Sequence, residues 1–476
     1  MSPEEAEQFY AKRDGRTLQY GAAADALDTH LLLTAVETST TRPGQVALLA
    51  LVNMTARTHR TISVDLTPAS LAVSSMVPAT TIEEAVARTV LAINPAAVLI
   101  INGERRDIND LAVAETEPAV CLGVGSAASR RCQMWVGWSG GRAYLSTDPV
   151  GCGTAETDLI GAATAACLGA AALFHLSHGR PMMPMVLNLV DRVAAPLKWT
   201  GSIALDEPIM GVTTKTVGGP IDVGDVNLIG AGAVAHALAW WVRDIGYIGT
   251  WTVIDGDLAE LSNTNRCLAM TAADAGWPEG LPTAAPAPKA DILAALLGAR
   301  SQPIWFDQWT ARNPPRADLT LVLANERGVR AESAALGEPI LLHATTSPNW
   351  TAELHRHRTG TDDCPACRIP DTARPAFACS TGPTCLQSTS ASSDAALPFL
   401  SATAGLMLAV ALQQISPDSA LVSGRYNHWS LCFEQTMRLR GSIHPQRCPH
   451  TLPSAARTLL RSNQPRRHDY LDSPSL

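Results

Sequence analysis

The second half of the chain alternates short apolar runs with amphipathic stretches, which is the pattern of a doubly wound α/β domain. We expect helices at 233–245, 289–299, 327–336 and 397–415. Between them, apolar runs predict strands at 226–230, 250–255, 303–307, 318–323 and 339–344, with a further pair near 421–440. A cysteine-rich stretch of low order at 360–393 interrupts the series. This order predicts a Rossmann-like fold with a mostly parallel sheet and helices on both of its faces.

The first half is also α/β in character. Residues 1–30 predict helix, and the periodic stretches 81–93 and 158–176 predict two more helices. Apolar runs predict strands at 45–53, 61–66 and 96–103, followed by further runs at 119–125 and 131–139. No glycine-rich loop joins a strand to a helix here, so this half is not expected to hold a nucleotide. A connection rich in Pro and Gly at 195–222 separates two domains, which we place at 1–205 and 206–476.

Each half contains a late helix built from small residues, at 159–174 and at 399–412. Any helix packed closely on a sheet becomes rich in alanine and glycine, so the similarity can reflect packing alone. A degenerate duplication of one domain would produce the same similarity. Both interpretations stay open at this point.

Composition excludes several classes of partner. The chain has 476 residues, enough for two domains, and its net charge of −8 argues against a nucleic-acid-binding surface. The polar N-terminus is unlike a signal peptide. Apolar stretches at 159–175 and 396–415 are interrupted by small and hydroxyl residues, which indicates buried helices instead of membrane spans. We therefore expect a cytoplasmic protein with no nucleic-acid or membrane partner, and eleven irregularly spaced cysteines fit a reducing compartment.

A glycine motif follows the predicted strand at 226–230. Gly230, Gly232 and Ala235 have the G-x-G-x-x-A spacing of a nucleotide-binding turn. The first glycine permits the tight turn, the second lets the backbone approach a phosphate, and the small third residue lets helix and strand pack closely. Asp255 ends the next strand, where a carboxylate can accept hydrogen bonds from ribose hydroxyls. The alternative is a turn in which glycine serves packing only.

The residues after Asp255 indicate what kind of nucleotide the site would bind. The sequence IDGDLAELSNTNR places Ser262, Asn263 and Arg266 beyond the carboxyl edge of the sheet, where ligands bind in such folds. A guanidinium there can bridge two phosphate oxygens and offset charge during attack at phosphorus. Lys289 begins the next helix, where an ammonium group adds to the attraction of the helix N-terminus for anions. Lysine occurs only four times against 32 arginines, which weakens the alternative of a solvated surface lysine.

Together these motifs resemble the ubiquitin-activating-enzyme-like adenylyltransferases, a superfamily that includes the ThiF- and MoeB-type activators. The resemblance covers about residues 220 to 440, and its specific part is the D…SN…R segment. It implies that Asp255 binds ribose, that Asp257 is the second acid of the motif, and that Lys289 contacts phosphate. It further implies a phosphate-side group made of Ser262, Asn263 and Arg266.

The resemblance also implies a reaction and its partners. With ATP and Mg²⁺, the enzyme would convert the C-terminal carboxylate of a separate ubiquitin-like carrier protein to an acyl-adenylate. A loop thiol would then capture the acyl group as a thioester for transfer to a separate conjugating enzyme. The first half would be the inactive copy found in pseudo-dimeric members, and the preference for arginine over lysine fits a high-GC prokaryotic source. A homodimer is left open.

Two residues depart from the family pattern. Cys267 stands where a glutamine is usual after the arginine. Asn325 stands where the family has an aspartate that meets Mg²⁺, with Glu326 beside it. Either Glu326 takes over that role or the metal is held more weakly.

Several cysteines point to metal or thiol chemistry. Cys364 and Cys367 form a C-x-x-C knuckle whose tight turn can direct two thiolates at one Zn²⁺. The resemblance implies a second pair near the C-terminus, which here would be Cys448 with His450 or His444. This set predicts a structural zinc site, while a redox C-x-x-C would need a strand–helix setting that is missing here.

Two further cysteines lie in a polar loop within the predicted crossing segment at about 360–395. Free cysteine is usually a small buried apolar residue, but Cys379 and Cys385 lie in a stretch rich in Gly, Pro and Ser. The resemblance makes them candidates for the thioester nucleophile, with Cys379 preferred and Cys385 as the alternative. We interpret the cysteines at 121, 132, 152, 167 and 432 as packing residues, His236 as a packed or capping histidine, and HRHRTG at 355–360 as a solvated loop.

Two other functions remain as alternatives. An NAD-dependent oxidoreductase would use the glycine loop and Asp255, but it leaves Arg266 and Lys289 unexplained. A non-catalytic scaffold that binds a ubiquitin-like partner is consistent with the changes at Cys267 and Asn325.

Overall fold

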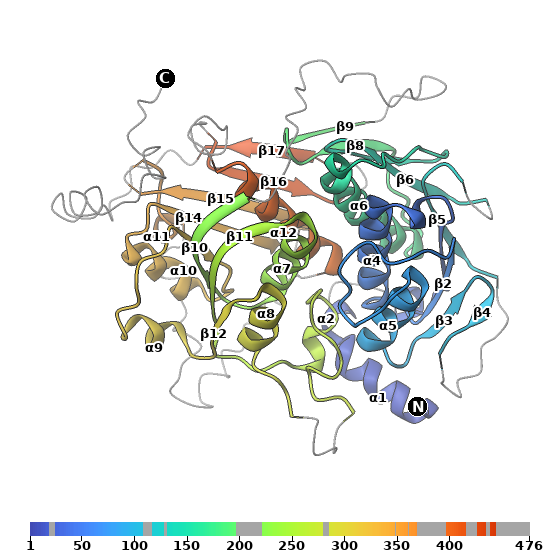
Figure 1. Cartoon of the computed structure of the whole chain (residues 1–476), viewed down its shortest axis with the longest axis horizontal. Coiled ribbons are helices and arrows are strands. Elements are labelled where there is room, and N and C mark those ends of the chain that lie inside the picture. The colour runs from blue at the N-terminus through green and yellow to red at the C-terminus, as the bar shows by residue number, and fades with distance from the viewer. Residues whose placement is uncertain are drawn as a thin grey trace.

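The chain folds into two α/β halves that lie side by side (Figure 1). The computed structural model describes residues 1–18, 24–107, 117–127, 131–196, 221–278, 285–347, 349–359, 361–368, 397–415, 426–434 and 438–443. Each half is built on one mixed sheet, with strand order β4-β3-β2-β1-β5-β6-β7-β8-β9 in the first and β12-β11-β10-β13-β14-β15-β16-β17 in the second. The predicted fold class, a doubly wound and mostly parallel α/β arrangement, is confirmed in the second half, where β10 to β14 are parallel.

The elements of the first half run from the N-terminus to Pro196. In chain order they are α1 (Pro3–Arg13), α2 (Gly15–Leu18), α3 (Ala24–Leu27), β1 (Leu31–Ala35), η1 (Thr38–Thr40), α4 (Arg42–Ala56), β2 (Thr61–Leu66), α5 (Ile82–Ile93), β3 (Val98–Ile101), β4 (Glu104–Arg105), β5 (Val120–Val124), β6 (Met134–Ser139), β7 (Arg142–Ser146), η2 (Glu156–Asp158), α6 (Leu159–Ser177), β8 (Met185–Asn188) and β9 (Val193–Pro196).

The second half follows the same kind of order. Its elements are β10 (Ile221–Ile229), α7 (Ala233–Ile245), β11 (Tyr247–Ile254), η3 (Leu261–Asn263), α8 (Lys289–Leu297), β12 (Arg300–Gln302), α9 (Phe306–Thr310), β13 (Leu319–Val322), α10 (Arg327–Ser333), η4 (Ala334–Leu336), β14 (Ile340–Ser347), β15 (Thr351–Arg358), α11 (Pro365–Arg368), α12 (Pro398–Gln413), β16 (His428–Cys432) and β17 (Arg438–Ser442). The boundary placed at residue 205 lies outside the described residues.

The two sheets correspond strand for strand once the short β4 is set aside. In each half a central parallel strand is followed by a helix and a neighbouring strand, and the last three strands run antiparallel. The small-residue helices α6 and α12 both enter between the first and second of those antiparallel strands. They therefore occupy the same place in their halves, as a duplication would require.

One hydrophobic core crosses the boundary between the halves. Helices α4 and α6 of the first half and α7 and α12 of the second lie together in the middle of the molecule (Figure 1). Small residues permit their close approach: a Cβ at Gly405 of α12 would lie 2.5 Å from the backbone nitrogen of Leu238 in α7. The stretch Glu156–Ser177 is long and apolar enough to cross a membrane, but its apolar window is 94% buried inside the fold. It is a core helix here.

Three local predictions are wrong. Residues 45–53 belong to helix α4, which begins after Thr41, whose Oγ1 accepts a hydrogen bond from the backbone N–H of Gly44 at 3.2 Å. The strand expected at 303–307 ends at Gln302, and Phe306 starts α9. The supposed loop at 355–360 begins inside β15, where Arg356 and His357 are buried. The central strand β1 was not predicted at all.

Cys121 and Cys132 are buried packing residues as predicted, but the bond between them was not anticipated from the sequence. The two residues form a disulfide between β5 and the residues leading into β6. Cys152, Cys167 and Cys432 are free thiols, and Cys167 is buried in α6 as expected.

Candidate active site

The glycine loop joins β10 to α7 at the carboxyl edge of the parallel strands. Gly230 has φ of +92°, and a Cβ there would lie 2.4 Å from the backbone nitrogen of Ala324, so only glycine fits. Gly232 has φ of −83° and precedes the first residue of α7. A Cβ at Gly232 would meet no heavy atom of the described residues within 4 Å. Ala235 is fully buried in the core. The loop is therefore closed toward the sheet and open in front of the helix.

Asp255 ties this loop to the next one. Its Oδ2 accepts a hydrogen bond from the backbone N–H of Ala231 at 2.5 Å, and its Oδ1 accepts one from the N–H of Asp257 at 2.7 Å. Burial raises the pKa of Asp255, which the nearby ammonium of Lys289 opposes. Each carboxylate oxygen has a further lone pair that a ligand hydroxyl can use.

Lys289 is the first residue of α8 and points back to the same edge of the sheet. Its Nζ lies 2.7 Å from Oδ2 of Asp257, and its side chain is 13% exposed. Burial alone would lower the pKa of Lys289, but the carboxylates of Asp257 and Asp255 raise it above its ordinary value. The ammonium group is thus charged and held within the site.

Arg266 lies on the segment that follows η3. Its guanidinium donates hydrogen bonds to the carbonyl oxygen of Ser262 at 2.8 Å and to Oδ1 of Asn265 at 2.9 Å. The residue is 8% exposed. The hydroxyl of Ser262 donates a hydrogen bond to Glu260 at 3.1 Å.

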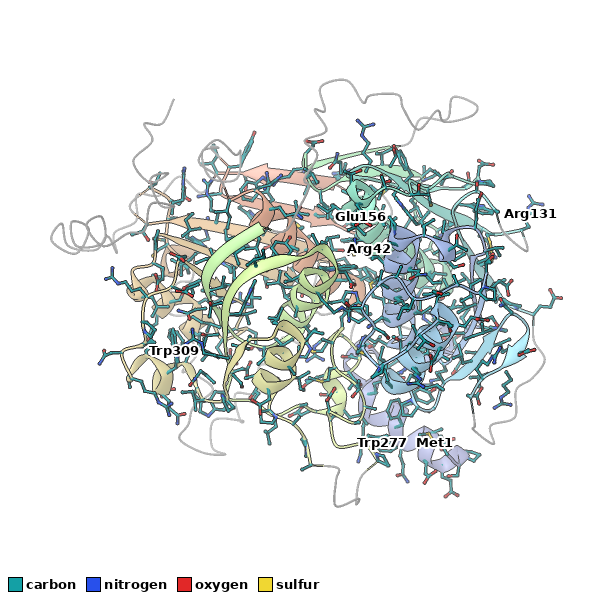
Figure 2. All side chains as sticks on the ribbon, in the orientation of Figure 1. Met1, Arg42, Arg131, Glu156, Trp277 and Trp309 are labelled. Atoms are coloured by element: carbon teal, nitrogen blue, oxygen red, sulfur yellow. A yellow bond between two sulfur atoms is a disulfide. The ribbon has the colours of Figure 1, made fainter. Side chains whose placement is uncertain are left out.

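The first half of the molecule holds the 261–270 segment in place. The fully buried guanidinium of Arg57 donates to the carbonyl oxygens of Thr264, of Leu268 at 2.7 Å and of Met270 at 3.1 Å. Trp277 lies farther along the same region, packs against Phe9 of α1 with ring centroids 5.4 Å apart, and is close to Met1 (Figure 2). The backbone that carries Arg266 is therefore shaped by both halves.

These residues surround one pocket of about 340 Å³, within the usual range for small-molecule sites. Nine of the residues named from the sequence line it: Gly230, Gly232, Asp255, Asp257, Asn263, Arg266, Lys289, Asn325 and Glu326. Ser262 and Ala235 do not. The sequence did not single out other lining residues, namely Glu260, Trp305, Phe306, Arg330, Thr345 and Thr346. The ring of Trp305 lies against Gly256, where a Cβ would be 2.5 Å from it. Gly256, which directly follows Asp255, was the sequence signal that could have pointed to this contact with Trp305.

Acidic and amide oxygens also line the pocket. Burial raises the pKa of Glu326, and the carboxylates of Asp255 and Asp257 raise it further, so these three acids influence one another. Asn325, beside Glu326, also lines the pocket. Oxygen donors of this kind suit Mg²⁺.

His236, in the first turn of α7, reports the electrostatic character of the site. It is fully buried, and neither ring nitrogen has a hydrogen-bond partner among the described residues. Burial, together with the positive charges of Arg57, Lys289 and Arg266, lowers its pKa to about 3. Three cations therefore act on the N-terminal turn of α7, which itself favours anions. His236 is a packed neutral histidine, as predicted.

The predicted zinc ligands are described only in part. The Sγ atoms of Cys364 and Cys367 lie 3.6 Å apart. This separation is close to the edge of about 3.8 Å expected for two thiolates on one tetrahedral Zn²⁺ with bonds of about 2.3 Å. Cys448, His450 and His444 lie outside the described residues, as do both nucleophile candidates, Cys379 and Cys385.

Comparisons with known proteins give little that bears on this site. No protein-family model matches the chain. It is 30% identical over 257 residues to the uncharacterized protein y4jF of Sinorhizobium fredii, a match that covers 52% of this chain and 46% of that protein. The chain thus spans about half the length of this curated relative.

Solved structures show a distant likeness only. Escherichia coli MccB with MccA-N7isoASN is 15% identical, with a TM-score of 0.35 over 48% of this chain and 66% of that one. MccB with AMPCPP and MccA gives 15% and 0.34, covering 48% and 65%. PaaA gives 12% and 0.30, covering 46% and 64%. TM-scores this low carry no argument about chemistry.

Proposed function

We propose that this protein is an ATP-dependent adenylyltransferase that activates a carboxylate of a partner protein or peptide. One observation carries the proposal: the two cations Arg266 and Lys289 line the same pocket as Gly232 and the open N-terminus of α7. A dinucleotide oxidoreductase has no evident use for two cations in the pocket beyond the ribose-binding acid. An enzyme that cleaves a triphosphate needs them to offset charge in the transition state.

The site supports a division of roles. Asp255 would accept hydrogen bonds from the ribose hydroxyls, using the lone pairs left by its two backbone contacts. The N–H groups of α7, with Arg266 and Lys289, would hold the phosphates. The partner's carboxylate oxygen would attack the α-phosphorus, and the bond to the bridging oxygen of pyrophosphate would break. Lys289 would exchange its contact with Asp257 for one with phosphate.

Asp257, Asn325 and Glu326 would hold the Mg²⁺ ion that accompanies ATP. Their oxygen atoms are the donors that Mg²⁺ prefers, and Glu326 would supply the carboxylate that Asn325 lacks. The ion would neutralise phosphate charge.

The finer parts of the proposal rest on the family resemblance of the D…SN…R segment. The partner would be a ubiquitin-like carrier protein, and Cys379, or alternatively Cys385, would receive the acyl group as a thioester before a separate conjugating enzyme takes it. Cys364 and Cys367 would bind a structural Zn²⁺ with Cys448 and His450 or His444. An ATP-dependent, thiol-sensitive adduct with the carrier should vanish in Cys379→Ala or Cys385→Ala, and elemental analysis should find zinc. An adduct that survives both changes would remove the thioester step alone.

The test of the nucleotide assignment does not require the partner. Calorimetric titration with ATP and with NAD⁺ should show binding of ATP. Arg266→Ala should weaken ATP binding by roughly 10- to 100-fold, the loss of one charge-assisted hydrogen bond. Arg300→Ala, at an exposed position at the start of β12, is the matched control and should leave the affinity unchanged. With candidate carriers, ATP–pyrophosphate exchange should disappear in Arg266→Ala while the variant remains folded. Exchange at the wild-type rate in that variant would refute the assignment, and tighter binding of NAD⁺ than of ATP would favour the oxidoreductase.

A further inference from the structure

Three histidines form a row across the antiparallel part of the second sheet. His343 on β14, His355 on β15 and His428 on β16 are successive cross-strand partners. Their rings stack, with centroids 4.0 Å apart between the first two and 4.3 Å between the last two. Their strand neighbours Leu354 and Trp429 belong to the hydrophobic core, so the histidines occupy the opposite face of the sheet.

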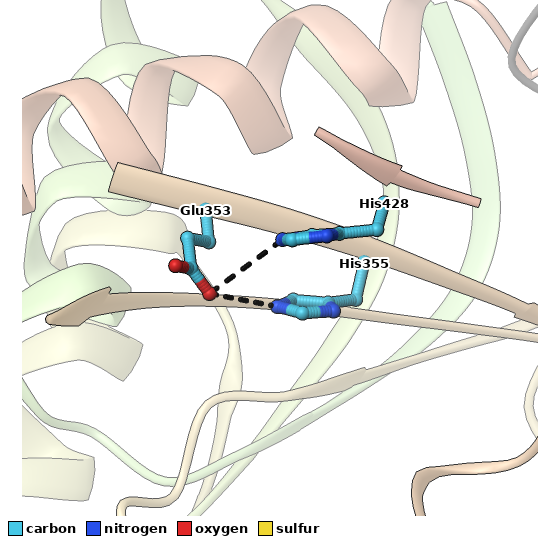
Figure 3. A group of neighbouring side chains, drawn as sticks. All are labelled: Glu353, His355 and His428. Carbon is cyan, nitrogen blue, oxygen red and sulfur yellow. Dashed lines mark hydrogen bonds and ion pairs between the residues drawn. The ribbon is translucent and has the colours of Figure 1, made fainter. Parts of the chain in front are cut away.

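A carboxylate joins two of these rings. Glu353 lies two residues before His355 on β15 and therefore on the same face. Its Oε2 lies 3.3 Å from Nε2 of His355 and 3.6 Å from Nε2 of His428 (Figure 3). The donor atoms of the three side chains all lie within 4.8 Å of one another.

We propose that Glu353, His355 and His428 form a binding site for a divalent transition-metal ion of the Zn²⁺ type. Ligands at about 2.0–2.1 Å from a tetrahedral Zn²⁺ lie about 3.3 Å from one another, close to the two oxygen–nitrogen distances seen here. Imidazole with carboxylate is a donor set that suits zinc and its neighbours, whereas Mg²⁺ and Ca²⁺ prefer oxygen alone. Three protein ligands leave a coordination position for water or another donor.

The cluster lies next to the candidate active-site pocket. Thr345 is the cross-strand partner of Glu353 and also lines the candidate active-site pocket. The side chains of the cluster are 10% to 23% exposed, so an ion can reach them and is still shielded. The three ligands include neither the oxygens near Glu326 nor the thiols of Cys364 and Cys367, and the inference does not depend on the proposed adenylyltransferase activity.

The surrounding residues determine which ring nitrogen can bind the ion. Nδ1 of His428 lies 2.9 Å from Oγ of Ser442, which can accept the ring proton and leave Nε2 for the metal. Nδ1 of His355 instead contacts the guanidinium of Arg368, a donor. When Nε2 of His355 binds an ion, the single ring proton of the neutral imidazole must move from Nε2 to Nδ1. Arg368 must then withdraw to Asp363, with which it already pairs at 2.5 Å and 2.7 Å. Removing Arg368 should therefore strengthen metal binding.

The experiment uses Co²⁺ as the probe on the untagged, metal-depleted full chain. Cobalt bound by nitrogen and oxygen shows visible d–d bands, while cobalt bound by Cys364 and Cys367 adds a thiolate charge-transfer band. The two sites are thus distinguished in one spectrum. Besides the thiolate band that Cys364 and Cys367 would give, we expect a separate d–d signal of the nitrogen–oxygen type that reaches saturation and is displaced by Zn²⁺.

Variants decide the assignment. His428→Gln and Glu353→Gln should each weaken Co²⁺ binding by about 100-fold, since even an outer-shell partner contributes about 10- to 100-fold. Arg368→Ala should tighten it, and His178→Gln, a histidine outside the cluster, should leave it unchanged. Circular dichroism checks that each variant is folded. The test uses His428 and not His355 because His428 is the more exposed of the two histidines, so its replacement disturbs the fold less. The proposal would be overturned if the wild-type protein gave no nitrogen–oxygen signal. It would also be overturned if His428→Gln and Glu353→Gln bound Co²⁺ with the affinity of the wild type.

Discussion

The two glycines of the loop before α7 should respond to the same substitution in opposite ways. At Gly230 an added Cβ would lie 2.4 Å from the nitrogen and 2.6 Å from the Cα of Ala324, and φ is +92°. The left-handed conformation alone costs about 1–2 kcal/mol, and the backbone of Ala324 cannot move away without disturbing the end of β13. We expect Gly230→Ala to destabilise the protein by about 3 kcal/mol or more, in the range reached by strained core substitutions.

At Gly232 the same methyl group has room within the protein. Its φ of −83° is ordinary for alanine, and the loss of glycine at the position before the helix should cost about 0.5–1 kcal/mol. The methyl group would, however, stand where a phosphate approaches the N–H groups of α7. Losing one such contact should weaken ATP binding by about 1.5–3 kcal/mol, roughly 10- to 100-fold.

Thermal melting and calorimetric ATP titration separate the two effects. Gly230→Ala should melt well below the wild type. Gly232→Ala should melt close to it, and we expect added ATP to raise its melting temperature less than that of the wild type. Wild-type ATP affinity in Gly232→Ala would refute the inferred position of the phosphates, and wild-type stability in Gly230→Ala would refute the argument from backbone strain.

Three further predictions concern other parts of the molecule. Arg57→Met should destabilise the protein by about 2–4 kcal/mol, because buried carbonyls lose their donor. The control Arg42→Met, at a half-exposed contact between the same halves (Figure 2), should change stability by about 0.5 kcal/mol or less. Equal melting temperatures of the two variants would contradict this prediction. Burial raises the pKa of Glu338 to about 7, so its contribution to stability is fully present below the ordinary value of 4.5 and is lost as pH rises through about 7. Glu338→Gln should therefore flatten the decline of melting temperature over this range, and parallel profiles would show that this carboxyl does not titrate as inferred. Asp255→Ala should raise KM for ATP in pyrophosphate exchange more than it lowers kcat; an effect on kcat alone would place this carboxylate at the reacting phosphate.

The parts of the fold that could be predicted are those where local signals agree. Helix α7 runs from Ala233 to Ile245 as expected, because a glycine turn precedes it and Gly246 follows its last residue. The run QVALLALVN was mistaken for a strand because a continuous apolar stretch fits a buried strand and a buried helix equally well. Thr41 and Pro43, which cap and start α4, carried the information that separates the two.

The parts that could not be predicted depend on contacts between distant residues. The polar stretch around Arg356 lies in a buried strand because Asp362 pairs with Arg356 at 2.9 Å. No local pattern announces such a pairing. Glu353 and His428 come from strands about 75 residues apart in the chain, so only the β15–β16 register brings them together. The acids and cations of the candidate site could be predicted because they follow consecutive strands at one edge of the sheet.

Arg57 has a consequence for the genetics of this protein. In the hydrogen bonds described above, its guanidinium donates to carbonyl oxygens and not to a carboxylate. A charged side chain of the first half thus organises the backbone of the second. If the chain were divided in the connection between the halves, the second fragment would contain every residue that lines the pocket but would lack the guanidinium that holds the segment of Arg266. Alleles that disrupt the region around Arg57 should therefore be as inactive as alleles of Arg266, and the two fragments should restore activity only when expressed in the same cell.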